Sequence, residues 1–171
     1  YKSFGFKEEI FERLANATVR SDVWNELDRG EWSMEKIIDA FIANDPGIEE
    51  EIRRVFRDTG NILVKREYAI PWIHHLRKLG YQVLYLSNMG EDTHIKCKEA
   101  LAFMEHMDGG VLSYEFKRVK PDVRIYQALI EKYNVIPEES VFVDDTLKNV
   151  IAARSPKGGQ FCIFRKPISI S

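Results

Sequence analysis

Two adjacent carboxylates, Asp144 and Asp145, stand at the end of the apolar run 141–143. In an open α/β sheet, ligands bind outside the carboxyl ends of the strands, so these side chains are well placed for chemistry. At about 4 Å and an effective dielectric constant near 20, two like charges repel by roughly 4 kcal/mol. A divalent cation would offset that repulsion, and oxygen ligands suit Mg²⁺. Taken alone, the pair is better explained by Asp145 acting as the N-cap of a following helix.

Two other strand ends carry polar residues suited to a phosphate group. Ser87 and Asn88 follow an apolar run, where they are placed to donate to phosphate oxygens near a helix N-terminus. Lys120 is a compact positive charge, and Pro121 after it is expected at the first position of a helix. Each has an ordinary explanation as a turn residue or a solvated lysine. Their occurrence at successive strand ends, together with the acidic pair, favours a site for a phosphate and its metal.

The elements that position these residues alternate between strand and helix from about Tyr68 onward. Short apolar runs of strand type occupy residues 83–86, 110–113, 141–143 and 161–164. Helical spacing of apolar residues occupies 72–79, about 92–106, the segment after Pro121, and 147–151, where Leu147, Val150 and Ile151 are expected to face inward. This alternation predicts an α/β fold with a parallel sheet covered by helices on both faces.

The first part of the chain has a different character. From Phe6 to about Val64 the apolar residues recur at spacings of three and four, which predicts helices throughout. Ser33 stands where an N-cap belongs, and the segment Asn44–Gly47 is typical of a turn between two helices. The sequence therefore predicts a small all-helical unit ahead of the sheet.

Composition and charge narrow the function classes. The chain has 171 residues, a net charge of −2, 44% hydrophobic and 30% charged residues, which is typical of a soluble globular protein. No overall field favours nucleic acid, and no apolar stretch reaches the ~18 residues of a membrane span. Cys97 and Cys162 lack metal-type spacing and are expected to be small buried residues in a reducing compartment, which favours a cytoplasmic location.

The order of the three polar groups resembles the haloacid dehalogenase-like hydrolase superfamily. The similarity is to its phosphatase-type branch with a small helical cap, subfamily IA, which includes sugar-phosphate phosphatases. It covers nearly the whole chain and implies a Rossmann-like sheet. The segments that carry it are Leu84–Asn88, Lys120–Tyr126 and Val141–Asp145.

The resemblance implies a role for each residue. Ser87, with Asn88, would bind the transferring phosphoryl group, and Lys120 would stabilise its charge. Asp145 would be the main Mg²⁺ ligand and Asp144 the supporting one. Asn149 stands where relatives often carry another Asp, and it is expected to hydrogen-bond to the site without contacting the metal.

One family motif does not occur in this sequence. The resemblance implies an Asp-x-Asp motif at the end of a first strand, whose first Asp is the nucleophile that forms an aspartyl-phosphate. No Asp-x-Asp occurs anywhere in the chain. We therefore expect the first strand to be absent from these residues and the nucleophile to lie upstream of Tyr1. Residues 1–65 would form the cap and 66–171 the core, and the 171 residues alone would be inactive.

The expected function is that of a Mg²⁺-dependent phosphomonoester hydrolase acting on a small phosphorylated metabolite. We expect no nucleic-acid or membrane partner, and a monomer or homodimer. A metal-independent 2-haloacid dehalogenase of the same fold is the alternative enzyme, although two carboxylates would repel its anionic substrate. A phospho-receiver domain has similar residues but places its acidic pair first in the chain. A non-catalytic phosphate- or partner-binding descendant is the remaining alternative.

Overall fold

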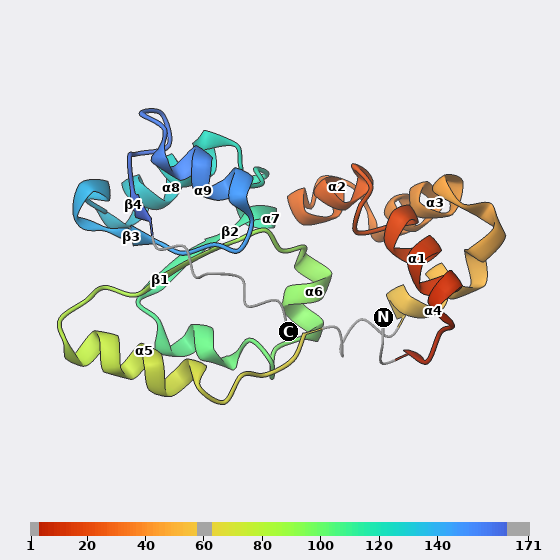
Figure 1. The fold of residues 1–171 in the computed structure, drawn as a ribbon, viewed down its shortest axis with the longest axis horizontal. Coiled ribbons are helices and arrows are strands. Elements are labelled where there is room, and N and C mark those ends of the chain that lie inside the picture. Colours follow the sequence, from red (N-terminus) through yellow and green to blue (C-terminus); the bar gives the residue numbers. More distant parts are fainter. Residues whose placement is uncertain (1–3, 58–62, 164–171) are drawn as a thin grey trace.

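The computed structural model describes residues 4–57 and 63–163 and has two parts (Figure 1). The helical part contains four helices, and the α/β part carries the strands. The helical elements of the first part are α1 (Glu8–Ala17), α2 (Val23–Arg29), α3 (Met34–Asn44), the 3₁₀ turn η2 (Pro46–Ile48) and α4 (Glu49–Arg57).

The helical part has a hydrophobic core of its own. Its buried side chains come from all four helices and include Leu14, Ile37, Phe41 and Ile52, each with no exposed area. Ser33 caps α3 as predicted, since its side chain accepts a hydrogen bond from the Lys36 N–H at 3.3 Å. The spacing of three and four in the sequence thus marks the faces that this core buries.

The α/β part alternates strands and helices. Its elements are α5 (Ala69–Lys78), β1 (Leu84–Ser87), α6 (Glu91–Lys96), η4 (Ala102–His106), β2 (Gly109–Leu112), α7 (Ser113–Phe116), α8 (Val123–Tyr133), η5 (Pro137–Glu139), β3 (Val141–Phe142), α9 (Leu147–Arg154) and β4 (Cys162–Ile163). Strand β1 pairs in parallel with β2, and β3 pairs in parallel with β4. The predicted parallel pairing is confirmed, although the strands are short.

Side chains of β1 and β2 alternate between two cores. Leu84, Leu86 and Val111 pack with α8 and α9, in the cluster built around Ile125 and Phe142. Tyr85 and Leu112 point to the other face, where Cys97 and Leu101 cover them. Both faces of this ladder are therefore covered, which is the arrangement expected of a parallel sheet.

The segment 92–106 is not the single helix that its pattern predicts. Helix α6 ends at Lys96, turns follow, and η4 continues in 3₁₀ conformation. Both Cys97 and Leu101 are buried against β2, and η4 is fastened to α5 by the Arg77 side chain, which donates to the His106 carbonyl at 3.0 Å. A 3₁₀ helix rises about 2.0 Å per residue, against 1.5 Å in an α-helix, so it spans a longer distance with the same number of residues. This longer rise lets the chain extend from the buried Leu101 to the beginning of β2.

Other local predictions were wrong. Pro121 precedes the helix instead of opening it, because Asp122 is the N-cap of α8 and accepts from the Arg124 N–H at 3.0 Å. On α9, Val150 is buried but Leu147 and Ile151 are exposed, since the helix packs through Val150 and Ala153. Cys97 is buried as predicted, whereas Cys162 is exposed.

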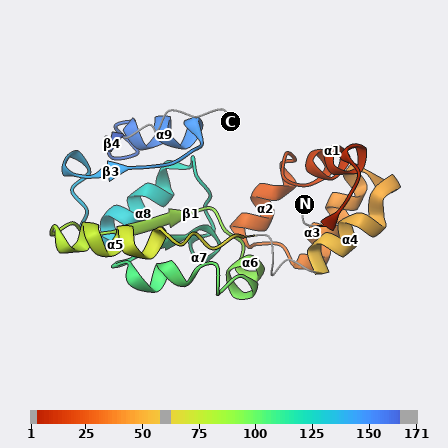
Figure 2. The same ribbon diagram turned by 60° about the horizontal axis from the view of Figure 1, so that its bottom comes forward.

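The helical part meets the α/β part through α2 and α7. Figure 2 shows α2 at the edge of the helical part that faces the strands. The Lys117 side chain donates to the Gly30 carbonyl at 2.7 Å, and the Ser113 hydroxyl donates to the Asp28 carbonyl at 2.5 Å. Within residues 4–57 and 63–163, no helix is long and apolar enough to cross a bilayer.

Candidate functional site

Lys120 lies at the centre of the predicted site. Its Nζ donates to the Asp144 Oδ2 at 2.6 Å and to the Leu86 carbonyl at 2.7 Å. The residue is only 8% exposed, and the Asp144 side chain 6%. This buried ion pair joins the carboxyl end of β1 to the segment after β3, so residues 34 and 24 positions from Lys120 in the chain converge on one ammonium group.

Asn88 fixes the backbone of Lys120. Its Nδ2 donates to the Lys120 carbonyl at 3.0 Å, and its Oδ1 accepts from the Lys120 N–H at 2.7 Å. The peptide bond between Lys120 and Pro121 is cis. Asn88 thus uses both ends of its amide on one residue, and the turn after β1 is tied to the segment before α8.

The Asp144 carboxylate is held by several donors in addition to Lys120. Its Oδ1 accepts from the Thr146 N–H at 2.8 Å, and the Asn149 Nδ2 lies 3.1 Å and 3.2 Å from its two oxygens. These contacts orient the carboxylate and offset its charge. The expected hydrogen bond from Asn149 to the site is present.

Ser87 and Asp145 are far less engaged than their neighbours. The one hydrogen bond found for the Ser87 hydroxyl in the described part of the chain is a 3.4 Å contact with the Asn88 carbonyl. Asp145 is exposed, and its carboxylate accepts only from the Thr146 hydroxyl, at 3.3 Å, within residues 4–57 and 63–163. A hydroxyl and a carboxylate therefore remain available for a ligand beside the Lys120–Asp144 pair.

Asn149 carries an unsatisfied acceptor. The residue is 5% exposed, and its Oδ1 has no hydrogen-bond partner among the described residues. An unpaired buried polar atom destabilises the folded protein by about 1–3 kcal/mol. We therefore expect this oxygen to contact a donor or a cation that the described side chains do not supply.

Asp28 belongs to the surroundings of the site and was not predicted. The residue lies near the end of α2 and is 9% exposed. Burial raises its pKa to about 7, although hydrogen bonds from the Gly90 N–H and the Trp24 side chain and the charge of Lys120 act to lower it. The spacing of Trp24, Leu27 and Asp28 places a carboxylate on the apolar face of a helix, which is the sequence signal that identifies it.

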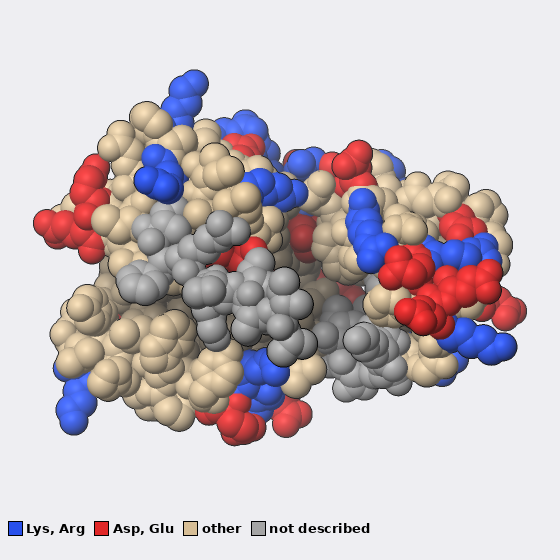
Figure 3. All heavy atoms as spheres, viewed as in Figure 1, with Lys and Arg blue, Asp and Glu red and all other residues tan. Residues whose placement is uncertain are grey.

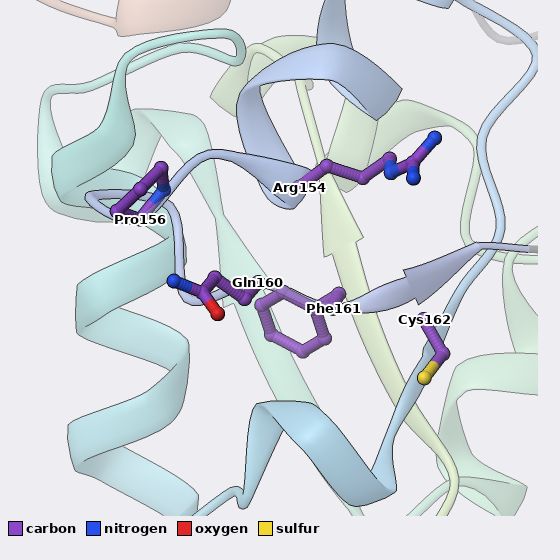
Figure 4. A pocket seen from close by; sticks show the side chains of 5 residues that line it. All are labelled: Arg154, Pro156, Gln160, Phe161 and Cys162. Carbon is purple, nitrogen blue, oxygen red and sulfur yellow. The ribbon is translucent and has the colours of Figure 1, made fainter.

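One hollow of the surface lies elsewhere. It has a volume of about 530 Å³ and is lined by Arg154, Pro156, Gln160, Phe161 and Cys162 (Figure 4). Since Cys162 pairs with Val141 at the beginning of β3, this hollow is at the amino end of the strands, away from Ser87 and Asp144. Figure 3 shows basic and acidic side chains interspersed on one face of the molecule, with no surface of a single sign. Neither feature competes with the strand ends as the site.

Comparison with known families decides the identity of the fold. The haloacid dehalogenase-like hydrolase family matches residues 7–155. The chain belongs to the haloacid dehalogenase-like hydrolases. It is therefore an enzyme of the hydrolase class, and the predicted Rossmann-like α/β fold is confirmed.

Individual relatives agree with this assignment. The sesquiterpene phosphatase astK of Aspergillus oryzae (strain ATCC 42149 / RIB 40) is 25% identical over 138 residues, which are 80% of this chain and 70% of that protein. A HAD family enzyme from Bacteroides thetaiotaomicron, solved as its magnesium complex, has a TM-score of 0.71 at 20% identity and covers 96% of this chain and 87% of its own. The same enzyme with magnesium and inorganic phosphate has a TM-score of 0.68 at 22% identity, with 99% and 84% covered.

Proposed function

We propose that this haloacid dehalogenase-like hydrolase is a Mg²⁺-dependent phosphomonoesterase. The observation that carries the proposal is the buried Lys120–Asp144 pair beside the lightly engaged Ser87 and Asp145. Ser87 donates to a phosphoryl oxygen, and Lys120 neutralises the charge on the phosphoryl group and on Asp144. Asn88 keeps Lys120 in place through its two hydrogen bonds. The branch with a small helical cap, subfamily IA, fits this arrangement.

The residues at the site fit a magnesium ion. Asp145 would hold it directly with support from Asp144, and both are oxygen ligands. The orphaned Asn149 Oδ1 would accept a hydrogen bond from water held near the ion. Mg²⁺ is commonly held by one or two carboxylates and completes its coordination shell with water and phosphate oxygens. Among the described residues no cluster of three potential ligands is found. When bound, the ion would neutralise developing charge on the phosphoryl oxygens.

The nucleophile is proposed to be an Asp upstream of Tyr1, on a strand between β1 and β3. In the part of the chain that the structure describes, β1 pairs with β2 alone and β3 with β4 alone, so each has a free side for another strand. Val141 and Val143 are 57% and 60% exposed, which such a neighbour would reduce. The Asp carboxylate would attack phosphorus to give an aspartyl-phosphate as the alcohol leaves, and water would then release phosphate.

The substrate is proposed to be a small phosphorylated metabolite. Residues 1–65 would act as the cap that selects it and 66–171 as the core that holds the phosphoryl group. The A. oryzae relative is named a sesquiterpene phosphatase, which supports a phosphorylated organic substrate. A monomer or homodimer is sufficient for this chemistry, because the proposed groups all come from one chain.

Ligand binding tests the proposal without requiring turnover. Thermal unfolding of the protein is followed with Mg²⁺, with inorganic phosphate, and with both together. The proposal predicts that phosphate stabilises the protein more strongly when Mg²⁺ is present, and that Asp145→Asn removes the Mg²⁺ effect. Asp92→Asn, on α6, serves as the control. An equal response of wild type and Asp145→Asn to Mg²⁺ would refute the proposed ligand, and metal-independent release of halide from a 2-haloacid would favour the dehalogenase instead.

A further inference from the structure

The end of helix α2 is fastened to the turn that follows the predicted phosphate-binding residues. The Asp28 carboxylate accepts from the Gly90 N–H, and its backbone carbonyl accepts from the Ser113 hydroxyl at 2.5 Å. The same hydroxyl accepts from the Met89 N–H at 2.8 Å. Residues 89 and 90 directly follow Ser87-Asn88. One residue of the helical part is thus bonded, directly and through Ser113, to both residues of this turn.

The two parts approach closely at this point. A Cβ on Gly90 would lie 2.9 Å from the Leu27 carbonyl, and a Cβ on Gly30 would lie 2.9 Å from the Tyr114 Cβ. Gly30 also has a φ of +67°, in the left-handed region. On one side of Asp28 the backbone of Gly90 packs against the backbone of Leu27, and on the other side the backbone of Gly30 packs against the side chain of Tyr114. Little room for water is left around the Asp28 carboxylate.

The burial of Asp28 is unfavourable for stability alone. No ion pair of this carboxylate is found among residues 4–57 and 63–163, and Lys120 acts on it only through space. A carboxylate taken out of water without a paired cation costs free energy, which its hydrogen bonds recover only in part. A leucine or asparagine of similar size would pack there without that cost. The position is thus explained better by what Asp28 does to the turn than by stability.

We propose that Asp28 is a positioning residue: it fastens the helical part onto the turn at Met89 and Gly90, and so holds Ser87-Asn88 in the closed arrangement that binds the phosphoryl group. The role in phosphate binding rests on the proposed phosphatase function. The fastening itself does not, since it follows from the Gly90 N–H that donates to the Asp28 carboxylate and from the Ser113 hydroxyl that donates to the Asp28 backbone carbonyl.

The same contact makes closure sensitive to pH. If α2 moves away, the Asp28 carboxyl meets water and its pKa returns from about 7 towards the ordinary value for Asp. Closure therefore takes up a proton. The contribution of Asp28 to the free energy of closure is fully favourable below the ordinary pKa of Asp. It is lost progressively as the pH rises from that value through about 7, and it changes no further at higher pH. The other titratable and charged groups on the elements packed around it are Lys120 before α8, Glu26 and Arg29 on α2, Glu91 and His94 on α6, and Tyr114 and Lys117 on α7.

Three variants of the complete protein test the proposal. Asp28→Asn keeps an acceptor for the Gly90 N–H but does not titrate, and Asp28→Ala removes the acceptor. Asp22→Asn, an exposed position just before α2, is the matched control. KM and kcat are measured between pH 5 and 8 with an aryl phosphate, and hydrogen exchange is followed for residues 86–92 and, as a reference, for α8.

The proposal predicts that Asp28→Ala raises KM by about tenfold or more, with a smaller change in kcat, and speeds exchange at residues 88–91 but not in α8. Asp28→Asn restores most of the KM. The ratio of wild-type KM to Asp28→Asn KM should rise between pH 5 and 7, by up to about tenfold per unit, and then level off. Asp22→Asn should match wild type throughout.

The proposal would be overturned if Asp28→Ala had the KM and the hydrogen exchange of the wild type. It would also be overturned if hydrogen exchange in this variant were faster in α8 as well as at residues 88–91, because that result indicates a merely structural role. A constant KM ratio across pH would overturn the proton-linked closure. If the wild-type protein hydrolyses no phosphate ester, the proposed function fails, and the exchange data alone still decide whether Asp28 fastens the turn.

Discussion

At the level of single residues, Lys120 organises the site. Its ammonium group joins the Leu86 carbonyl on β1 to the Asp144 carboxylate after β3, and its backbone is held by Asn88. Breaking a buried ion pair by removing one partner leaves the other charge uncompensated, at a cost of about 3–5 kcal/mol. The stability of this region and the positive charge that we propose acts on a phosphoryl group therefore depend on the same side chain.

Replacing Lys120 by Met should lower the free energy of unfolding by about 3–5 kcal/mol, because Asp144 stays buried without its cation. Combining Lys120→Met with Asp144→Asn should recover part of this loss, since the unpaired charge is then gone. Chemical denaturation of the single and double variants measures both effects. Lys98→Met, at an exposed lysine, is the control and should change stability little. A double variant no more stable than Lys120→Met would contradict the account.

The sequence indicated candidate residues for the site, but it did not predict which of them are paired and buried and which remain available to a ligand. Ser87 and Asp144 were identifiable because each is a polar group directly after an apolar run, and Asn88 follows Ser87. The prediction that Lys120 stands at a strand end was wrong, because β2 ends at Leu112 and α7 lies between that strand and Lys120. Asp28 is recognisable in the sequence only as a carboxylate on the apolar face of a helix, more than 50 residues away from Ser87. The docking of α2 onto the α/β part shows which residues it contacts. Tertiary contacts of that kind have no local pattern to reveal them.

At the level of elements, the turn after β1 and the segment before α8 act as one unit. Asn88 joins them with hydrogen bonds of 2.7 Å and 3.0 Å to the backbone of Lys120. Strand β1 and helix α8, which flank these two segments, were predictable in outline, because β1 is a short apolar run and α8 carries apolar residues at helical spacing. The break between α6 and η4, and the inward face of α9, were not predictable, because they depend on which side chains the neighbouring elements leave room to bury.

Asn88→Asp should separate these two elements. A carboxylate still accepts from the Lys120 N–H but cannot donate to the Lys120 carbonyl, so two oxygens would face each other. We expect a loss of about 1–3 kcal/mol in unfolding free energy, and a larger relative loss of phosphate binding. Calorimetry and phosphate titration measure the two. Asn16→Asp, which keeps an acceptor for Arg20, is the control. Unchanged phosphate affinity in Asn88→Asp would argue against the coupling.

At the level of the whole molecule, the proposed function depends on how the helical part sits on the α/β part. The contact is made by α2 with α7 and the turn after Asn88, and Gly30 is the residue that permits the closest approach to Tyr114. Sequence periodicity predicts a helical part followed by an α/β part, but it carries no information on their docking. That docking brings Asp28 and the proposed phosphate-binding turn together.

Gly30→Ala should loosen this docking. The new Cβ would lie 2.9 Å from the Tyr114 Cβ and would also be strained at a φ of +67°. Gly5→Ala, with a φ of +70° and no neighbour within 4 Å, isolates the backbone strain of about 1–2 kcal/mol. Hydrogen exchange at residues 88–91 should be faster in Gly30→Ala and unchanged in Gly5→Ala. Equal exchange in both variants would show that the contact with Tyr114 is unimportant.

The most direct test of the central claim is phosphate release from an aryl phosphate by a protein that includes the strand proposed to precede Tyr1, with Mg²⁺ and after chelation. We predict turnover that requires Mg²⁺, is abolished by the chelator and restored by added Mg²⁺, and falls by at least about a hundredfold in Asp145→Asn, in line with the loss of a group that stabilises transition-state charge. The 171 residues alone should show none. No release by a folded, complete protein with any divalent cation, or release that the chelator leaves unchanged, would contradict the account.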